Sequence, residues 1–219
     1  MTTLKSDRRA AKSGTAKTMM IFLHGYGADG KDLLGLADPL GEHLPDTVFV
    51  APNAPDRCTG NPMGFQWFPI PWLDGSSEEA AEQGLLTASQ TLNDWLDETL
   101  KTEGVSAANT IIFGFSQGTM ITLHVCPQRA EPFAGLVGFS GRLLHPEQLA
   151  DAVSKPPILL VHGDMDDVVP PSSMPEAADA LTAAGFQVYT HVSQGTGHGI
   201  AQDGLGVTLQ FARQQFGLA

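Results

Sequence analysis

Residues 109–125 read NTIIFGFSQGTMITLHV, and this stretch decides the fold that the sequence predicts. The β-branched and aromatic run at residues 109–113 predicts a buried strand, and residues 119–125 continue as a helix. Between them lies a Gly-x-Ser-x-Gly motif with Ser116 at its centre. A strand, a sharp turn and a helix form the context in which such a serine becomes a nucleophile, beside helix N–H groups that attract negative charge. Because 24 glycines make a chance match possible, partner residues elsewhere must support this interpretation.

Strand-like and helix-like segments alternate along the chain. Strands are predicted at residues 18–23, 47–50, 109–113, 133–139, 157–161 and 186–192. Helices are predicted at residues 33–40, 76–100, 119–125, 146–153, 175–184 and 205–216. This alternation predicts an α/β fold with a mostly parallel sheet and helices on both faces. We expect one domain at residues 18–219, preceded by a flexible basic leader at residues 1–17.

The charge is strongly negative, with 12 basic and 24 acidic residues. Five of the basic residues and one acid precede residue 18, which leaves 7 basic and 23 acidic residues in the remainder. Such a surface should repel nucleic acid and anionic membranes, so we expect neither as a partner and favour a substrate that is neutral near its reacting bond. No apolar run reaches the ~20 residues of a membrane span, which argues against stable membrane insertion. No secretory signal is evident, which favours the cytoplasm. Cys58 and Cys126 are expected to be reduced and incidental.

Residues 52–74 form a long predicted loop that contains five prolines and an unusual density of aromatic residues. A loop of this length in a compact domain is more often functional than not. We expect Phe65, Trp67 and Phe68 to form one wall of an apolar substrate pocket. The alternative is a hydrophobic plug that covers the sheet edge.

A serine hydroxyl needs a base within hydrogen-bond distance, and that base needs an orienting acid. Enzymes that use this turn place the acid after the serine and the histidine last. His198 fits this order because it lies in the GTGHG turn between the last predicted strand and the last helix. The histidines set aside on order or placement are His24, His43, His124, His145, His162 and His191.

The candidate acids follow the predicted strand at residues 157–161. Asp164, Asp166 and Asp167 all lie just beyond its carboxyl end, and spacing alone does not choose among them. A metal site is the competing hypothesis for this cluster, but no EF-hand-type spacing supports it. We expect neither a metal nor another cofactor.

A tetrahedral intermediate carries an oxyanion that needs two N–H donors. One is expected from Gln117, the residue after the serine, and the other from the HGYG turn at residues 24–27. His24 is expected to be a structural hydrogen-bonding residue in this turn.

These motifs together resemble the phospholipase/carboxylesterase family of α/β-hydrolases, which includes acyl-protein thioesterases and small bacterial carboxylesterases. The resemblance spans residues 18–216 and is carried by LHGYGADG (23–30), QWF (66–68), GFSQG (114–118), HG with DDVVP (162–163 and 166–170), and GH (197–198). It implies Asp166 as the acid and the N–H groups of Tyr26 and Gln117 as oxyanion donors. It also implies an α/β-hydrolase fold without a large lid domain, and a homodimer as a candidate assembly. Thr119, at a position where the family usually has glycine, and Pro127, which should shorten the helix, are departures.

The expected function is therefore a cofactor-free carboxylesterase. Ser116, His198 and Asp166 would cleave carboxylic esters of short to medium acyl chains through an acyl-enzyme intermediate. A thioesterase acting on acylated proteins and a lysophospholipase are the alternatives within enzymes. A catalytically silent binding module with the same fold is the alternative from another class.

Overall fold

The computed structural model describes residues 4–218. Within this range the main sheet has seven strands in the order β1-β3-β2-β6-β7-β8-β9. All neighbours pair in parallel except β1 and β3, which are antiparallel. The bounds are β1 Ser6–Arg9, β2 Thr18–Leu23, β3 Thr47–Pro52, β6 Thr110–Phe115, β7 Gly135–Phe139, β8 Ile158–Gly163 and β9 Val188–Ser193. The predicted α/β fold class is confirmed.

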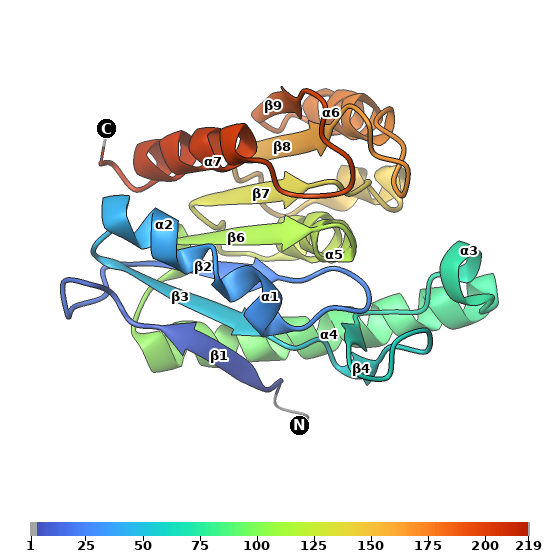
Figure 1. The fold of residues 1–219 in the computed structure, drawn as a ribbon, viewed down its shortest axis with the longest axis horizontal. Coiled ribbons are helices and arrows are strands. Elements are labelled where there is room, and N and C mark those ends of the chain that lie inside the picture. The colour runs from blue at the N-terminus through green and yellow to red at the C-terminus, as the bar shows by residue number, and fades with distance from the viewer. Residues whose placement is uncertain (1–3, 219) are drawn as a thin grey trace.

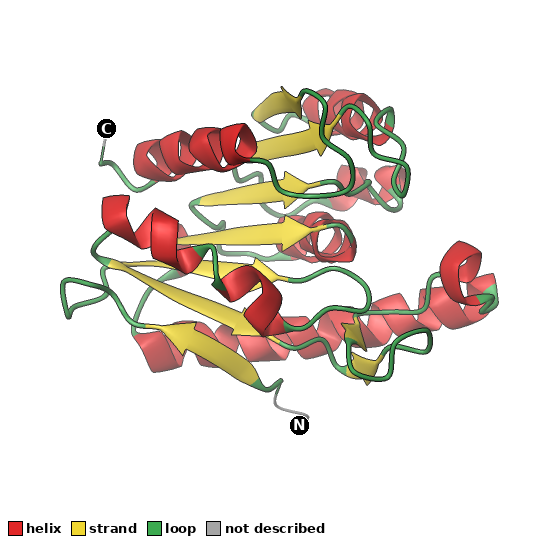
Figure 2. Cartoon of the chain, in the orientation of Figure 1, coloured by secondary structure: helices red, strands yellow, loops and turns green. Residues whose placement is uncertain are grey.

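Helices cover both faces of the sheet (Figures 1 and 2). The α-helices in the described residues are α1 Gly30–Leu34, α2 Ala37–His43, α3 Pro71–Asp74, α4 Glu78–Glu103, α5 Gln117–Val125, α6 Ser173–Ala183 and α7 Gln202–Gln215. Three 3-10 turns are η1 Ala107–Asn109, η2 Cys126–Gln128 and η3 Pro146–Asp151 within the same range. Helices α4, α5 and α6 lie behind the sheet in Figure 1, and α1, α2 and α7 lie in front. None of these helices has the length and apolar character needed to cross a membrane.

The strands supply apolar side chains to two separate layers of core because successive residues point to opposite faces. In β2, Ile21 and Leu23 pack toward α4 and α5, whereas Met20 and Phe22 pack toward α1, α2 and α7. All four are fully buried. A continuous apolar strand is what a sheet covered on both faces requires, and this explains why the strands could be recognised from composition.

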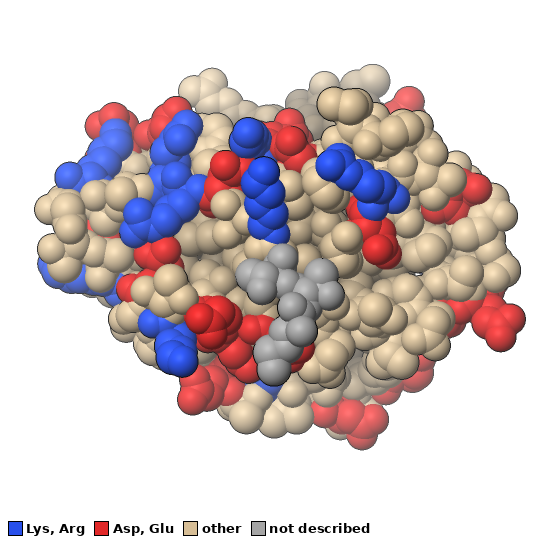
Figure 3. Space-filling model, turned by 90° about the horizontal axis from the view of Figure 1, so that it is seen from below, with Lys and Arg blue, Asp and Glu red and all other residues tan. Residues whose placement is uncertain are grey.

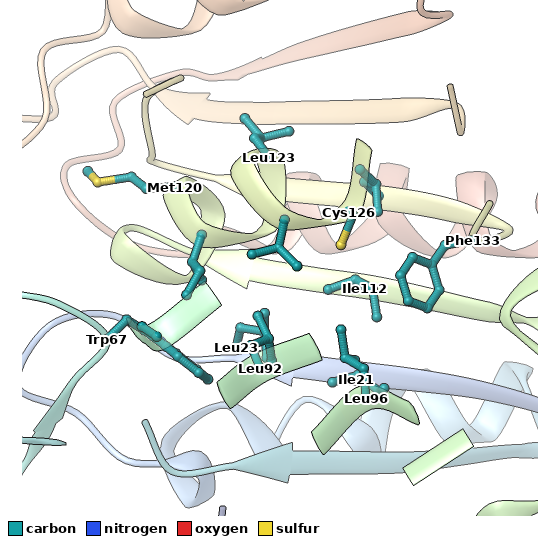
Figure 4. Packing of buried hydrophobic residues seen from close by; sticks show 14 of the residues in the cluster. Ile21, Leu23, Trp67, Leu92, Leu96, Ile112, Met120, Leu123, Cys126 and Phe133 are labelled. Atoms are coloured by element: carbon teal, nitrogen blue, oxygen red, sulfur yellow. The ribbon is translucent and has the colours of Figure 1, made fainter. Parts of the chain in front are cut away.

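The longest helix, α4, buries the apolar stripe that the sequence predicts. Its N-cap is Ser77, whose side chain accepts a hydrogen bond from the N–H of Ala80. Figure 4 shows Leu92 and Leu96 of this helix directed toward the core residues of the sheet and of α5. The helix therefore covers the part of this face where β2 lies, whereas α5 covers β6, and the first turn of α4 lies at the carboxyl edge of the sheet (Figure 1).

The prediction of a flexible leader is wrong for Ser6–Arg9, which form β1 at the edge of the sheet. Four ion pairs hold this segment and its continuation to the rest of the chain: Arg8 with Glu103, Arg9 with Asp38, Lys12 with Glu42, and Lys17 with Asp46. Figure 3 shows this underside, where basic side chains stand among acidic ones. Exposed ion pairs each contribute little to stability. The hydrogen-bonded ladder with β3 and the burial of Leu4 and Ala11 therefore do more to hold this segment on the sheet. Residues 1–3 lie outside the described range.

Two further predictions differ from the structure. The helix predicted at residues 33–40 is divided into α1 and α2, which meet at Gly35 and Leu36. Residues 52–74 are not free of regular structure. They contain a two-stranded ribbon, β4 Asp56–Arg57 with β5 Phe65–Gln66, and the short helix α3. Prolines interrupt long elements but permit short ones, because Pro71 occupies the first position of α3, where no N–H is needed.

Candidate active site

Ser116 lies at a sharp turn between β6 and α5. Its backbone has φ 53° and ψ −115°, a left-handed φ that is uncommon for residues with a side chain. A methyl group at Gly114 would lie 2.4 Å from the carbonyl oxygen of Gly118, and one at Gly118 would lie 1.8 Å from that of Leu23. Both glycines are therefore required for the helix to approach the sheet so closely. The strained turn directs the hydroxyl outward at the carboxyl edge of the sheet.

The structure brings three residues from different parts of the chain into one hydrogen-bonded series. The hydroxyl of Ser116 lies 3.0 Å from Nε2 of His198. Nδ1 of His198 lies 2.8 Å from Oδ2 of Asp166. A carboxylate can only accept, so Nδ1–H donates to Asp166 and Nε2 is left to accept the serine proton. This is the order of donors and acceptors that serine activation requires.

Asp166 is held in place by more than its contact with His198. Its other oxygen, Oδ1, accepts the N–H groups of Val168 and Val169, both at 2.9 Å. Nε2 of the buried His162 lies 3.1 Å from Oδ2 and 3.0 Å from the carbonyl oxygen of Val169. Burial by itself would raise the pKa of Asp166, but the hydrogen bonds from His198 and the two N–H groups outweigh it and lower that pKa. Asp166 is therefore ionised and fixed in orientation.

The loop that carries His198 is attached to the end of β8. Oδ1 of Asp164 accepts the N–H groups of Gly195 at 2.6 Å and Thr196 at 3.3 Å. A methyl group at Gly163 would lie 2.2 Å from the carbonyl oxygen of Thr196, so glycine permits the approach. Asp164 thus has a structural role, and Asp167 forms no side-chain hydrogen bond with any described residue. Geometry distinguishes three aspartates that spacing left equivalent.

The predicted oxyanion donors lie beside the serine. Gln117 is the first residue of α5, where N–H groups have no intrahelical acceptor. A methyl group at Gly25 would lie 3.3 Å from Cβ of Ser116, so the turn that contains Tyr26 contacts the serine. The N–H groups of Tyr26 and Gln117 have no acceptor within residues 4–218. Two unpaired donors next to a serine hydroxyl are what an oxyanion needs.

His24 has the structural role predicted for it. Its ring donates from Nδ1 to the carbonyl oxygen of Gly25 at 2.8 Å and accepts at Nε2 from the N–H of Ala54 at 2.9 Å. Burial lowers the pKa of His24, so the ring is neutral and this tautomer can form both bonds. The bonds fix the turn at residues 24–27 against the end of β3.

The predicted pocket residue Trp67 is instead a core residue. It is fully buried, and Figure 4 shows it among Leu23 and Leu92. Its indole N–H donates to the carbonyl oxygen of His24 at 2.9 Å. The side chain of Gln117 accepts from the N–H of Trp67 at 2.9 Å and donates to the carbonyl oxygen of Phe68 at 2.7 Å. A side chain without exposed surface cannot line an open pocket. The QWF motif instead joins the segment at residues 52–74 to Gln117 and to the turn at residues 24–27.

Phe65 and Phe68 each line a hollow, although Phe68 is nearly buried, with 4% of its surface exposed. Phe68 lines a cavity of about 80 Å³ together with Trp72 and Leu144. Phe65 is half-buried beneath the guanidinium of Arg57, 4.1 Å from its ring centroid, and lines a different hollow beside Leu4. Phe68 therefore borders a cavity only with the small part of its side chain that is exposed, and its role as a substrate-pocket wall stays a prediction.

Thr119 fills the space beneath the serine turn. Its hydroxyl lies 2.8 Å from the carbonyl oxygens of both Gly114 and Phe139. A methyl group at Gly138 or Gly141 would lie 2.6 or 2.4 Å from the Thr119 side chain. The threonine thus joins β6, β7 and α5 at the point where the serine emerges. The second predicted departure also has its expected effect, because α5 ends at Val125, just before η2 and its proline.

A sequence model described as phospholipase/carboxylesterase matches residues 8–215, almost the whole chain. The chain belongs to the phospholipase/carboxylesterase family. Curated relatives cover most of its length. It is 33% identical over 177 residues to acyl-protein thioesterase 1 of Saccharomyces cerevisiae, covering 74% of this chain and 76% of that protein. It is 28% identical over 189 residues to esterase YpfH of Escherichia coli, covering 84% and 77%.

Solved structures have the same fold. The crystal structure of esterase PE8 matches with a TM-score of 0.92 and 42% identity, covering 97% of this chain and 99% of the other. The structure of Arabidopsis thaliana SOBER1 matches with a TM-score of 0.78 and 23% identity, covering 91% and 99%, which is a likeness of fold. The phospholipase/carboxylesterase chain thus has the α/β-hydrolase fold that its motifs predict, without a large separate lid among the described residues.

Two contacts around the site could not be predicted from the sequence. His162 does not fit the chain order of a base. The turn that follows β8 nevertheless brings its ring into contact with Asp166. Tyr26 donates its hydroxyl to Oδ2 of Asp74 at 3.2 Å, and burial raises the pKa of this phenol, so it stays protonated. Asp74 belongs to α3, and its bond with Tyr26 joins that helix to the turn at residues 24–27. The contact between Tyr26 and Asp74 joins residues 48 apart in the chain and leaves no spacing pattern.

Proposed function

We propose that this protein is a serine hydrolase that cleaves carboxylic esters of short to medium acyl chains. The observation that carries the proposal is the hydrogen-bonded series from Ser116 through His198 to Asp166. Membership of the phospholipase/carboxylesterase family supports the same reaction class. The esterases among its relatives support ester bonds as substrates.

The first half of the reaction forms an acyl-enzyme. Ser116 Oγ attacks the ester carbonyl while Nε2 of His198 takes the hydroxyl proton. The resulting imidazolium is stabilised by Asp166, which is ionised and accepts the Nδ1–H bond at 2.8 Å. His198 then gives the proton to the leaving alkoxide. The alcohol departs, and the acyl group remains on the serine.

The second half repeats these steps with water as the nucleophile. His198 takes a proton from water, the hydroxide attacks the acyl-serine carbonyl, and the serine oxygen is released when it is reprotonated. In both halves the carbonyl oxygen becomes an oxyanion, and we assign its stabilisation to the N–H groups of Tyr26 and Gln117. Donors that are already fixed need no reorganisation at the moment of reaction, which is where much of the rate gain arises.

A small cavity lies on the far side of Phe68, whose carbonyl oxygen accepts from the Gln117 side chain, and we assign the end of a short acyl group to it. The hollow lined by Phe68 and Leu144 has about 80 Å³, well below the roughly 300 Å³ at which pockets for drug-sized ligands begin. Exposed apolar side chains lie on two loops at this edge: Trp72 and Leu73 on α3, and Met165 and Val168 around Asp166. These residues offer contact to parts of a substrate that extend beyond the cavity.

A thioesterase is the second candidate because a relative at 33% identity is an acyl-protein thioesterase. The proposed machinery would act on either bond, since both reactions pass through an acyl-serine. The ratio of kcat/KM for p-nitrophenyl butyrate to that for a butyryl-S-peptide separates the two. An ester preference supports the carboxylesterase, and a preference for the S-acyl peptide supports the thioesterase.

The test of the proposal compares Ser116→Ala with Ser154→Ala. Both serines are nearly buried, at 8% exposure each, so each variant removes one similarly enclosed hydroxyl. Ser116→Ala should lose both ester turnover and labelling by a fluorophosphonate, and its circular dichroism should be unchanged. Ser154→Ala should keep ester turnover and fluorophosphonate labelling. Wild-type protein that neither turns over esters nor accepts the fluorophosphonate would support a silent binding module instead.

A further inference from the structure

Arg142 lies beside the proposed nucleophile. It follows β7 by way of Ser140 and Gly141, and β7 is the neighbour of β6 in the sheet. A methyl group at Gly141 would lie 3.0 Å from the carbonyl oxygen of Ser116. Because consecutive Cα atoms are about 3.8 Å apart, Arg142 begins one residue from direct contact with the serine turn. From there its side chain extends to Trp72 of α3.

The guanidinium of Arg142 has an unusual environment for this chain. It lies 5.4 Å from the ring centroid of Trp72, and it forms no hydrogen bond or ion pair with any residue in 4–218. Each of the other arginines has an oxygen partner: Arg8 with Glu103, Arg9 with Asp38, Arg57 with Met63, Arg129 with Asp97, and Arg213 with Leu218. An unpaired arginine is notable in a protein with 24 acidic residues.

Two of the carboxylates near Trp72, those of Asp74 and Glu82, are engaged elsewhere. Asp74 accepts hydrogen bonds from Tyr26, from the N–H of Ile70 at 2.9 Å and from that of Ser76 at 2.9 Å. Glu82 contacts the ring of His145 at 3.2 Å. The bonds of Asp74 also fix α3, which carries Trp72, and the bond from Tyr26 joins this helix to the turn at residues 24–27. Arg142 and Trp72 thus form a contact between two loops that flank Ser116.

We propose that Arg142 binds an anionic group, carboxylate or phosphate, carried by the ester substrate. The proposal rests on the proposed hydrolase function and specifies its substrate class. The cation–π contact with Trp72 uses no N–H donor in a hydrogen bond, so the five N–H donors of Arg142 have no acceptor within residues 4–218. The planar fork of these donors matches two oxygens of a carboxylate or phosphate. The excess of acidic residues repels anions over much of the protein surface. The guanidinium of Arg142 would therefore determine how an anionic ester is oriented near Ser116.

The experiment measures kcat/KM for matched pairs of esters. On the acyl side, mono-p-nitrophenyl glutarate is compared with neutral p-nitrophenyl valerate. On the alcohol side, 1-butyrylglycerol 3-phosphate is compared with 1-butyrylglycerol. The variant is Arg142→Gln, and the control is Arg57→Gln. Arg57 also forms a cation–π contact, because its guanidinium carbon lies 4.1 Å from the ring centroid of Phe65.

A hydrogen bond to a charged group contributes enough to change an affinity about tenfold to one-hundredfold. Arg142→Gln should therefore lower the anionic-to-neutral ratio at least about tenfold in one pair, and that pair identifies whether the acid or the alcohol carries the anion. Arg57→Gln should leave both ratios unchanged. A ratio that Arg142→Gln leaves unchanged in both pairs would overturn the proposal, because it would assign Arg142 to packing alone.

A binding measurement separates failure of this inference from failure of the proposed function. Calorimetric titration of Ser116→Ala protein with glutarate and with inorganic phosphate needs no turnover, and neutral glutaramide serves as the control ligand. At least one of the two anions should bind, and adding Arg142→Gln should weaken that binding at least about tenfold. If neither anion binds more tightly than glutaramide, Arg142 is not an anion site, whether or not the protein hydrolyses esters.

Discussion

Replacing Asp166 by asparagine gives the sharpest test of the proposed chemistry, because it exchanges one acceptor oxygen for an NH₂ donor and removes the charge at almost constant size. The introduced amide could still accept the N–H groups of Val168 and Val169 with its carbonyl oxygen, as Oδ1 does now at 2.9 Å. Its NH₂ group would then face Nδ1 of His198, where Oδ2 now lies at 2.8 Å. A donor in this position forces Nδ1 to accept, so the single ring proton moves to Nε2. A protonated Nε2 cannot accept the hydroxyl proton of Ser116.

The expected loss is large. An amide that imposes the wrong tautomer in a Ser-His-Asp site lowers kcat roughly 10⁴-fold, which corresponds to about 5.5 kcal/mol of activation free energy. The assay is p-nitrophenyl ester hydrolysis with active-site titration to correct for inactive protein. Urea unfolding should show a much smaller loss of stability, because the two N–H bonds remain.

Two neighbouring aspartates provide matched controls. Asp167→Asn should keep kcat/KM within about twofold, since its side chain forms no hydrogen bond with a described residue and surface substitutions are near neutral. Asp164→Asn should have an intermediate effect, because Asp164 holds the loop of His198 through Gly195 and Thr196. An Asp166→Asn enzyme within tenfold of wild type, or an Asp167→Asn enzyme as impaired as Asp166→Asn, would refute the assigned hydrogen-bond order.

The remaining predictions concern stability. Thr119→Val should lower the free energy of unfolding by about 1 kcal/mol, because it removes the hydroxyl that bonds the carbonyl oxygens beneath the serine. Thr122→Val, also buried in α5 but bonded only within its helix, should cost less in the same urea titration, and the reverse order would contradict this reasoning. Burial lowers the pKa of His24, so the unfolded chain binds its proton more readily. The stability that neutral His24 contributes is therefore complete above the unfolded pKa of about 6.5 and decreases as pH falls below it. Unfolding free energies measured on either side of this pH should differ less in His24→Gln than in wild type, and an equal difference in both would count against the assignment.

Much of the site could be predicted because its chemistry depends on short local patterns. A strand followed by Gly-x-Ser-x-Gly identifies Ser116, since only such a turn brings a helix so close to the sheet. His198 followed from chain order and from its glycine-rich turn. Family resemblance selected Asp166 from three candidates, and the geometry agrees with that choice.

Other assignments could not be made from local patterns. Trp67 looked like a pocket wall because an aromatic residue in a loop has the same composition whether it faces a ligand or the core. Its burial depends on Gln117 and His24, which are distant in the chain. The segment Ser6–Arg9 has no apolar alternation, and it becomes a strand only because β3 offers an unpaired edge.

The sequence by itself determined the class of fold, the serine turn, the candidate base and the family motifs of this protein, because each depends on local residue patterns. Tertiary structure decided which aspartates are structural, which aromatic residue is enclosed, and that Arg142 stands unpaired beside the serine turn. The physical reason is that strands adjacent in a parallel sheet end at one edge, so side chains tens of residues apart meet there. Their distances and partners are properties of that edge and of no segment taken alone.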